Sequence, residues 1–488
     1  MHPRRVVIIG GGAAGLSAAY TLRKKGIEPL LLESLAHVGG RLAGEQVNGF
    51  FVDAGADFFC SSYDVTYRIC EELNVPLVRS EMKLGWYRNG RWTTTTPGLS
   101  ATNLVRNLPA AWSLGFLSPR SVRAARKLFG EMVRQSARLS FSSDSRLAEL
   151  DDGETFGDYL DRLGAPRSLQ SSLRGFLKMT MGDVENSGQA YMRTYLLEML
   201  LKADKLRVPA RGASDLARAL AAACGDAIHV STPVHRVETR DDVVTGVATD
   251  KGPIEADAVI CAVPATRVPD LIPGLPAGIR RALETVTYSS GCRVVIGLDH
   301  RPLPAGWHGA LYPEDDTPLL LDRSVNLPSC VPPGKSTLDL IVGRDRGREL
   351  LRLGDEEIKR ELLREARRNP PPGSALPADD EGLFTRVYRW KEAVCMGRPG
   401  MFRAISDMHR LHGRGFCNLF FAGDYMRTPS VNGALASGVR AAEEVADLLA
   451  RQSPGMALAG SALGASAHLR DLRESPPYVR SLIDPWNS

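Results

Sequence analysis

The chain opens with a short apolar run, a glycine-rich turn and an amphipathic stretch. Residues 5–9 are mostly β-branched, which predicts a buried strand. Residues 13–25 have helical periodicity and end at Gly26, a residue typical of a helix carboxyl end. Residues 27–33 predict a second strand. A strand, helix and strand in this order predict a right-handed crossover between parallel strands.

The hydrophobic pattern becomes helical between about residues 84 and 205, which predicts an inserted helical region. The periodicity is strongest in residues 118–141, 155–163 and 190–202. Strand patterns return afterwards, as a hairpin over residues 230–249 and a following strand over residues 254–263.

Strand segments then alternate with proline-rich loops, at residues 292–298 and 338–342. Residues 355–368 predict a helix that Asp355 caps, because an aspartate side chain accepts hydrogen bonds from free helix amides. Residues 419–421 predict another buried strand, and residues 431–450 a last helix.

Composition narrows the class of protein. The chain has 488 residues, 43% hydrophobic and 24% charged, which is ordinary globular usage with room for two large domains. The net charge of +5 is too small and too dispersed to predict a nucleic-acid partner. The 8 cysteines are scattered without a C-x-x-C pair, so we expect a cytoplasmic protein without zinc or disulfides. Arg4 and Arg5 suggest an export signal, but the glycines that follow argue against it.

A dinucleotide fingerprint lies between the first strand and the first helix. Gly10-x-Gly12-x-x-Gly15 leaves room for a pyrophosphate beside the helix amides, and Ala14 lies in the same turn. Glu33, at the end of the second strand, can accept hydrogen bonds from ribose hydroxyls and would repel a 2′-phosphate. We therefore predict FAD or NAD rather than NADP.

Further motifs extend this pattern along the chain. They are Gly39-Gly40-Arg41, Asp53-x-Gly55-Ala56, Pro233-Val234, the stretch 258–264, Phe421-Ala422-Gly423-Asp424 and Asn432-Gly433-Ala434-x-x-Ser437-Gly438. With them, residues 4–450 resemble the flavin-containing amine oxidase superfamily, which includes monoamine oxidases, protoporphyrinogen oxidases and carotenoid desaturases.

The resemblance implies an α/β fold, with a Rossmann-type FAD-binding domain and a second α+β substrate domain that carries the helical insertion. The expected boundaries are 1–83, 207–288 and 413–451 for the FAD domain, 84–206 for the insertion, 289–412 for the substrate-binding sheet and 452–488 for a tail.

The same resemblance implies non-covalent FAD and assigns roles to particular residues. Glu33 would bind the adenosine ribose, Arg41 would lie near the pyrophosphate and flavin, and Asp424 would hold the ribityl-phosphate end. A surface Arg41 and a helix-capping Asp424 are the alternatives. The remaining expected cofactor contacts are Gly40, Gly55, Ala56, Val234 through its backbone, Gly423 and Val431.

Two departures distinguish this chain from amine oxidases of the superfamily. Arg293 stands where those enzymes place a lysine near flavin N5, and Ser430 stands where they often place a tyrosine of the substrate cage. Arginine cannot lose its proton as a buried lysine can, so Arg293 is either a permanent charge at the flavin or a salt bridge elsewhere. Trp390 is a candidate wall of the cavity or a core residue.

Other stretches resemble the protoporphyrinogen oxidase and desaturase branch. In that branch, the segment here read as 176–183 lines the substrate cavity, so Phe176, Leu177, Met179 and Met181 would suit a bulky apolar molecule, although they also suit a helix core. We therefore expect an FAD-dependent oxidase or dehydrogenase that transfers hydride from such a substrate, with O2 or another electron acceptor. An amine oxidase, or a binding protein like the Rab GDP-dissociation inhibitors, is the alternative.

Two surface features remain. Residues 118–141 contain six basic residues against the single acidic Glu131, with an apolar stripe that includes Val122, Phe129 and Val133. This predicts either peripheral contact with anionic lipid or a core-facing helix with a solvated basic face. His409 and His412 have a metal-ligand spacing but no further ligand nearby in the sequence, so no metal is predicted.

Overall fold

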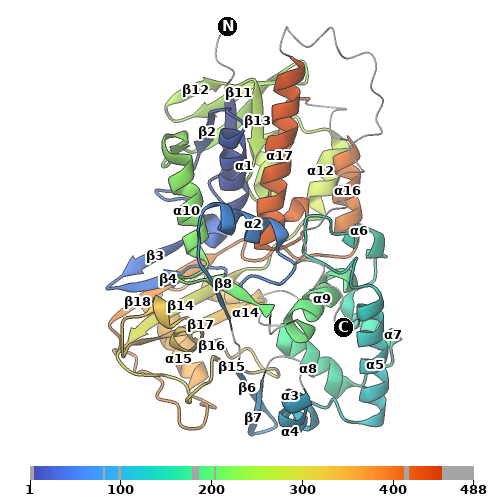
Figure 1. The fold of residues 1–488 in the computed structure, drawn as a ribbon, viewed down its shortest axis with the longest axis vertical. Helices are drawn as coiled ribbons and strands as arrows, with labels where there is room; N and C mark the ends of the chain where they lie inside the picture. Colours follow the sequence, from blue (N-terminus) through green and yellow to red (C-terminus); the bar gives the residue numbers. More distant parts are fainter. Residues whose placement is uncertain are drawn as a thin grey trace.

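A computed structural model of the chain describes residues 5–80, 83–96, 101–177, 186–202, 205–411 and 417–452. At one end of the molecule a parallel sheet has the strand order β19-β13-β1-β2-β9 (Figure 1). The strands are Leu419–Phe421, Ala258–Cys261, Val6–Ile9, Pro29–Leu32 and Ile228–His229. Every residue of the central strand β1 is buried, as is usual for a parallel sheet that is covered on both faces.

The first helix, α1 (Ala13–Lys24), ends as the sequence predicts. Gly26 adopts a φ of 74°, and the amides of Gly26 and Ile27 donate to the carbonyls of Arg23 and Leu22. The last helix, α17 (Val431–Arg451), lies beside α1, with α10 (Ser214–Cys224) on the other side (Figure 1). A Cβ on Gly438 would lie 2.0 Å from the Ala14 carbonyl oxygen, so glycine is required at this crossing.

A smaller antiparallel sheet consists of β10 (Val234–Arg240), β11 (Val243–Thr249) and β12 (Gly252–Glu255). The single strand expected over residues 254–263 is therefore wrong. The chain leaves this sheet after Glu255 and enters the parallel sheet as β13 at Ala258. The expected hairpin also begins later than residue 230, because residues 228–229 pair with β2 instead.

The second domain is built on a sheet with the order β18-β14-β17-β16-β15-β6-β7. The strands are Phe384–Trp390, Gly291–Leu298, Ser336–Gly343, Leu319–Asp322, Gly309–Leu311, Leu84–Arg88 and Arg91–Thr95. The helical pattern expected from residue 84 is thus wrong for residues 84–95, which form a hairpin at the sheet edge. These residues pair in the sheet with segments more than 200 positions away, which local periodicity does not reveal.

The side chains of β14 point alternately to the two faces of this sheet, so the two faces contact different elements. Val294 and Ile296 pack on α15 (Asp355–Ala366), whereas Val295 packs on β4 (Phe50–Asp53) of the β3–β4 hairpin, whose first strand is Gly44–Val47. Arg293 shares the face of Val295, toward the parallel sheet. Gly354 rather than Asp355 occupies the cap position of α15, because the Asp355 carboxylate binds Arg389.

Helices beyond β7 form a layer on the right of Figure 1. They are α3 (Ala101–Arg106), α4 (Leu108–Ser113), α5 (Pro119–Arg134), α6 (Leu147–Leu150), α7 (Phe156–Arg162), α8 (Arg167–Leu177) and α9 (Gln189–Leu196). Ser118 caps α5, which ends at Arg134 and not at residue 141 as expected. The expected tail, 452–488, lies outside the described residues except for Gln452.

Shorter elements complete the two domains. They are α2 (Asp64–Glu72), the pair β5 (Leu77–Arg79) and β8 (Arg207–Pro209), α11 (Val268–Leu271), α12 (Ala277–Glu284), α13 (Arg323–Asn326), α14 (Arg344–Leu350) and α16 (Met401–Leu411). None of the described helices combines the length and apolar character needed to span a bilayer.

Candidate functional site

The glycine turn between β1 and α1 forms a small open cradle. Gly10 has a φ of 102°, and a Cβ on Gly15 would lie 1.9 Å from the Gly10 carbonyl oxygen, so both glycines are needed for the turn itself. Gly12 differs, because a Cβ there would meet nothing within 4 Å. No side chain caps the amino end of α1 at Gly12. The open space and the free helix amides fit a pyrophosphate.

Glu33 is fixed beside this turn. Its carboxylate accepts hydrogen bonds from the Gly11 amide (2.7 Å) and the Leu35 amide (2.9 Å). The Glu33 carbonyl accepts a hydrogen bond from the Thr232 amide at 2.8 Å, which places the start of β10, and with it Val234, next to the end of β2. Glu33 and Val234, predicted to contact the adenosine part of the cofactor, therefore lie in neighbouring segments.

Arg41 and Asp424 form a two-pronged ion pair next to the glycine turn. The Arg41 guanidinium donates to both carboxylate oxygens of Asp424, at 2.7 and 2.9 Å, and lies 5.3 Å from the centre of the Tyr288 ring. A Cβ on Gly40 would approach the Gly12 Cα at 3.2 Å, so the Gly40–Leu42 turn adjoins the fingerprint. The two predicted cofactor residues thus lie together, and their alternatives, a surface arginine and a capping aspartate, do not describe this contact.

A buried network of charged side chains lies between the two domains, on the face of β14 that carries Arg293 and Val295. The Arg293 guanidinium donates to the Gly55 carbonyl at 3.0 Å and pairs with Asp57 at 2.9 Å and with Asp339. Only 3% of the Arg293 side chain is exposed. Burial opposes ionisation of Asp57, but Arg293 and Arg323 outweigh it and lower the pKa of that carboxyl.

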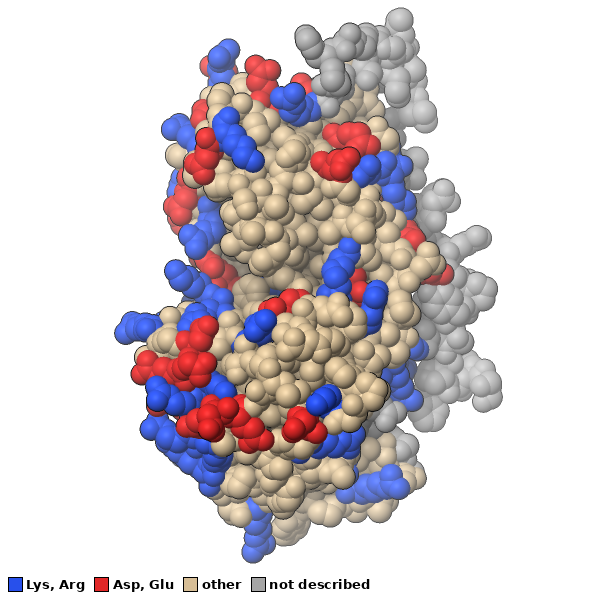
Figure 2. All heavy atoms as spheres, turned by 90° about the vertical axis from the view of Figure 1, so that its left-hand side faces the viewer, with Lys and Arg blue, Asp and Glu red and all other residues tan. Residues whose placement is uncertain are grey.

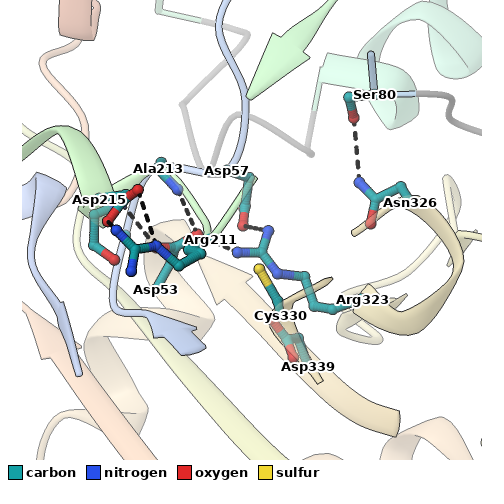
Figure 3. A network of polar contacts seen from close by, with 12 residues as sticks. Asp53, Asp57, Ser80, Arg211, Ala213, Asp215, Arg323, Asn326, Cys330 and Asp339 are labelled. Atoms are coloured by element: carbon teal, nitrogen blue, oxygen red, sulfur yellow. Dashed lines mark hydrogen bonds and ion pairs between the residues drawn. The ribbon is translucent and has the colours of Figure 1, made fainter. Parts of the chain in front are cut away.

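Arg323, on α13, links the same aspartates from the other side. It pairs with Asp57 at 2.9 Å and with Asp53, whose carboxylate accepts the Ala213 and Ser214 amides at 2.9 Å, at the amino end of α10 (Figure 3). Gly55 and Ala56, both predicted to contact the cofactor, therefore lie between the buried Asp53 and the half-buried Asp57, which are held by two arginines. The backbone there is rigidly placed.

His308 borders this network without a partner. It is 3% exposed, and neither ring nitrogen has a hydrogen-bond partner within the part of the chain that the structure describes. Burial, together with the charge of Arg323, lowers the pKa of His308 to about 4. The ring is therefore neutral in the folded protein at neutral pH.

We expect acid to destabilise the protein through His308. An unfolded histidine has a pKa of about 6.5, so the stability contributed by the neutral ring is full above that pH and is lost as the pH falls toward 4. Between about pH 7.5 and pH 5 this group should cost about 2 kcal/mol of unfolding free energy. Urea unfolding of the wild type and of His308→Leu at both pH values measures it. An equal acid loss in the two proteins would contradict the prediction.

The side chains of Trp390 and Ser430 each form a hydrogen bond with the backbone of another residue. Trp390 is half-buried and its indole N–H donates to the Ala54 carbonyl at 3.0 Å, one residue from Gly55. The Ser430 hydroxyl accepts the Gly433 amide at 2.9 Å and caps α17, whose first residue is Val431. Trp390 thus adjoins the predicted flavin contacts, and Ser430 has a structural role that the sequence comparison with tyrosine did not suggest.

Replacing Ser430 tests that role. Ser430→Ala should lower the unfolding free energy by about 1 kcal/mol, the usual value of a serine cap, while the protein keeps its flavin. Ser118→Ala is the matched control, because Ser118 caps α5 in the same way, far from the glycine turn. Urea unfolding and the flavin absorbance of the purified variants measure both effects. Loss of flavin from Ser430→Ala alone would show that the hydroxyl acts in the site.

The predicted substrate residues are only partly described. Phe176 stacks on Trp86 of β6, with ring centres 5.9 Å apart, and is 5% exposed, while Leu177 is fully buried. These two residues join the helical layer to the large sheet. Met179 and Met181 lie outside the described residues.

Several residues near the site belong to none of the sequence motifs described above. Tyr288 lies under Arg41, and Arg323 completes the charge network. The Tyr191 hydroxyl donates to the Pro429 carbonyl at 3.2 Å, next to Ser430, and a Cβ on Gly397 would meet the Tyr191 ring at 2.7 Å. An aromatic side chain therefore does reach this region, but from α9 rather than from α17.

The surroundings of His409 and Cys395 show what these two side chains contact. Among the described residues, no group of three metal-binding side chains comes together. His409 instead binds the Met426 carbonyl and the Arg440 guanidinium, and His412 is not described. Cys395 is fully buried with its sulfur 4.0 Å from that of Met401, so it points into the core.

The fold and these residues define a dinucleotide-binding oxidoreductase. Comparison with known proteins identifies the family within this class. Residues 13–446 match the family model described as flavin containing amine oxidoreductase. The chain belongs to this family, so it is an FAD-dependent oxidoreductase. The FAD contacts of Gly12, Glu33, Arg41 and Asp424 stay predictions. The interpretation as a binding protein without redox chemistry is set aside.

The relatives fall into more than one branch. A putative flavin-containing monoamine oxidase, AofH of Mycobacterium tuberculosis, is 29% identical over 53% of this chain and 56% of its own length. The match thus spans about half of that relative. A phytoene dehydrogenase of Streptomyces griseus is 26% identical over 93% of this chain and 98% of its own.

Solved structures share the fold. A putative protoporphyrinogen oxidase from Exiguobacterium sp. 255-15 superposes with a TM-score of 0.70 at 19% identity, covering 91% of this chain and 99% of the other. An engineered putrescine oxidase gives a TM-score of 0.70 at 18% identity, covering 92% of this chain and 99% of the other. At these identities the likeness concerns the fold alone.

Proposed function

We propose that this enzyme dehydrogenates a bulky, mostly apolar substrate, as in the protoporphyrinogen oxidase and carotenoid desaturase branch, rather than a small amine. The observation that carries the proposal is the state of Arg293. This residue stands where amine oxidases of the family place a lysine, and here it is a buried cation fixed by Gly55, Asp57 and Asp339. Burial opposes its charge, yet the two aspartates raise the pKa of Arg293 above its usual value.

A permanent cation changes what this position can do. A lysine at the flavin can lose its proton and then accept one from an ammonium substrate, whereas an arginine that is paired with Asp57 and Asp339 stays protonated and cannot. A neutral, apolar substrate needs no such proton acceptor. Trp390 near Gly55, and Tyr191 near Ser430, provide flat apolar surfaces on this side of the site.

The comparisons add weight in the same direction. The match with the phytoene dehydrogenase runs through nearly the whole of both chains, whereas the match with AofH spans about half of each. An amine substrate is the second candidate, favoured by the higher identity to AofH within that half.

Bound FAD would accept the hydride that the substrate loses, together with a proton, as a double bond forms in the substrate, and would later give the two electrons to O2 or another acceptor. The protein positions the reacting groups. Arg41 and Asp424 fix the turn beside the glycine cradle, and Arg293 holds the Gly55 backbone. The buried network keeps water out of the region in front of β14.

Anaerobic reduction of the bound flavin tests the proposal. We expect a protoporphyrinogen-type tetrapyrrole or a polyene to bleach the flavin absorbance of the holoenzyme, and primary and secondary amines to leave it oxidised. Arg293→Lys is the matched variant, and it should gain reduction by amines if the missing proton acceptor at this position excludes them. Rapid bleaching of the wild type by amines alone would overturn the proposal. Re-oxidation under O2, compared with a quinone, then identifies the class of acceptor.

A further inference from the structure

The first two helices of the helical layer expose an unusual amount of apolar surface. Leu104 and Val105 of α3, Leu108 and Trp112 of α4, and the following Leu117 are all exposed, and the Trp112 side chain is 75% exposed. We call these five side chains the α3–α4 face. Seven of the eleven large apolar side chains that are exposed in the described chain lie in residues 104–133. Contiguous exposed apolar surface of this kind marks a site of contact with another surface.

This face has no partner among the residues that the structure describes, because the buried sides of the helices point elsewhere. Ala110 and Leu114 are buried, and the Leu114 carbonyl accepts the Ser172 hydroxyl of α8 at 2.6 Å. Asn107 holds α4 to the end of β7 through two hydrogen bonds of 2.9 Å with Thr96. The helices are therefore fixed with their apolar side chains outward, at the end of the molecule opposite the parallel sheet (Figure 1).

The charge around this face has one sign. Between residues 96 and 141 the single acidic residue is Glu131, and it turns inward to the Tyr159 hydroxyl and Arg193. Arg106, Arg120, Arg123 and Arg126 are exposed and have no acidic partner within the described parts of the chain. Elsewhere acidic and basic residues interleave, as over the lower half of the face in Figure 2. Arg346, for example, pairs with Glu361 and Glu365.

The structure places the apolar stripe predicted for residues 118–141 partly inside and partly on the surface. On α5, Met132 is buried and Phe129 is half-buried, whereas Val122 and Val133 are exposed. The basic side of α5 is solvated, and most of the exposed apolar residues that accompany it come from α3, α4 and the segment that follows α4.

We propose that the α3–α4 face inserts into the interface of an anionic phospholipid bilayer, with the arginines of α3 and α5 on the lipid headgroups. Exposed apolar side chains beside unpaired arginines are complementary to such a surface, since the acyl boundary accepts the former and the phosphates accept the latter. Tryptophan is well suited to this depth, because its ring is apolar and its N–H is polar. A second protein copy would present its own arginines to this face and repel it.

This inference goes beyond the proposed function and is independent of turnover, although the two fit together. Ser172, which binds α4, lies one helical turn before Phe176 on α8, so the α3–α4 face is connected directly to the residues predicted to line the substrate cavity. An apolar substrate dissolves in a bilayer, and α8 connects the α3–α4 face with the residues predicted to line the substrate cavity.

Vesicle flotation of the holoenzyme tests the inference. We expect the wild type to float with vesicles of equimolar phosphatidylcholine and phosphatidylglycerol, and to stay unbound with phosphatidylcholine alone or in high salt. Arg120→Gln with Arg123→Gln should weaken binding on the order of 30-fold, since each arginine contributes roughly fivefold near an anionic surface. Leu108→Ser with Trp112→Ser should weaken it by a similar factor.

Matched controls remove charge or apolar surface elsewhere. Arg352→Gln with Arg360→Gln, and Val243→Ser with Leu383→Ser, change exposed residues far from α3 and should bind like the wild type. Wild type that does not float overturns the inference, as does equal weakening by the control variants. A dimer in sedimentation that Leu108→Ser with Trp112→Ser dissociates, without vesicle binding by the wild type, would show that a second copy covers the face. Flavin reduction is measured separately, so failure here does not affect the proposed function.

Discussion

Gly12→Ala is expected to lose FAD while the apoprotein stays as stable as the wild type. A methyl group at this position meets nothing within 4 Å, and the residue has an ordinary φ of −73°, so the fold accommodates it. The same methyl occupies the space that the cradle leaves for a pyrophosphate beside the α1 amides. We expect FAD affinity to fall by at least about tenfold, measured by titrating FAD into apoprotein, with urea unfolding of the apoproteins as the stability measurement.

The chain contains a close control for this substitution. Gly354 caps α15 with a φ of −71° and a ψ of 163°, and a Cβ there also meets nothing within 4 Å. Gly354→Ala therefore makes the same chemical change at the same kind of helix start, without a cofactor. It should bind FAD like the wild type. Full FAD content in Gly12→Ala would show that the cofactor does not approach the chain at this turn.

Arg293→Met is expected to be the most destabilising single change in the site. It removes the guanidinium from Asp57 and Asp339 and leaves their carboxylates buried, with Arg323 as the remaining cation at Asp57. Breaking a buried ion pair by deleting one partner costs about 3–5 kcal/mol. Urea unfolding of the apoprotein measures the loss, which should be smaller in Arg293→Lys because that variant keeps a cation.

Two further variants separate charge from packing at Arg293. Arg293→Met combined with Asp339→Leu removes both members of one pair and should recover part of the stability. Arg389→Met is the surface control, because Arg389 lies on the neighbouring strand β18 and pairs with Asp355 in solvent, so it should cost less than about 1 kcal/mol. A loss from Arg293→Met no larger than that from Arg389→Met would contradict a buried charge role.

The fingerprint was predictable from the sequence because its constraints are local. Gly10, Gly12, Gly15 and Glu33 lie in one strand-turn-helix-strand unit, and Gly10 and Gly15 are required by the backbone of the turn itself. Arg41 and Asp424 lie far apart in the chain, and only the resemblance to a family placed them in one site. The structure then shows the two side chains in direct contact.

What the sequence could not reveal depends on pairing between distant strands. Residues 84–95 have a pattern that suits a helix or a strand, and their place beside β15 decides which one forms. Arg323 carries no motif, and its role follows from the packing of α13 against Asp53 and Asp57. Likewise, the exposure of Trp112 follows from how α4 sits on α8, which no periodicity within α4 determines.

The Arg41–Asp424 contact determines when the site can form during synthesis. The two residues are 383 positions apart, so a ribosome adding roughly 5–20 residues per second needs roughly 20 to 80 s to make the second after the first. Until then the growing chain has the glycine turn but lacks β19, Asp424 and α17. Holoenzyme assembly therefore awaits the synthesis of Asp424 and α17, and a message that stops short of residue 424 yields a polypeptide with an incomplete flavin site.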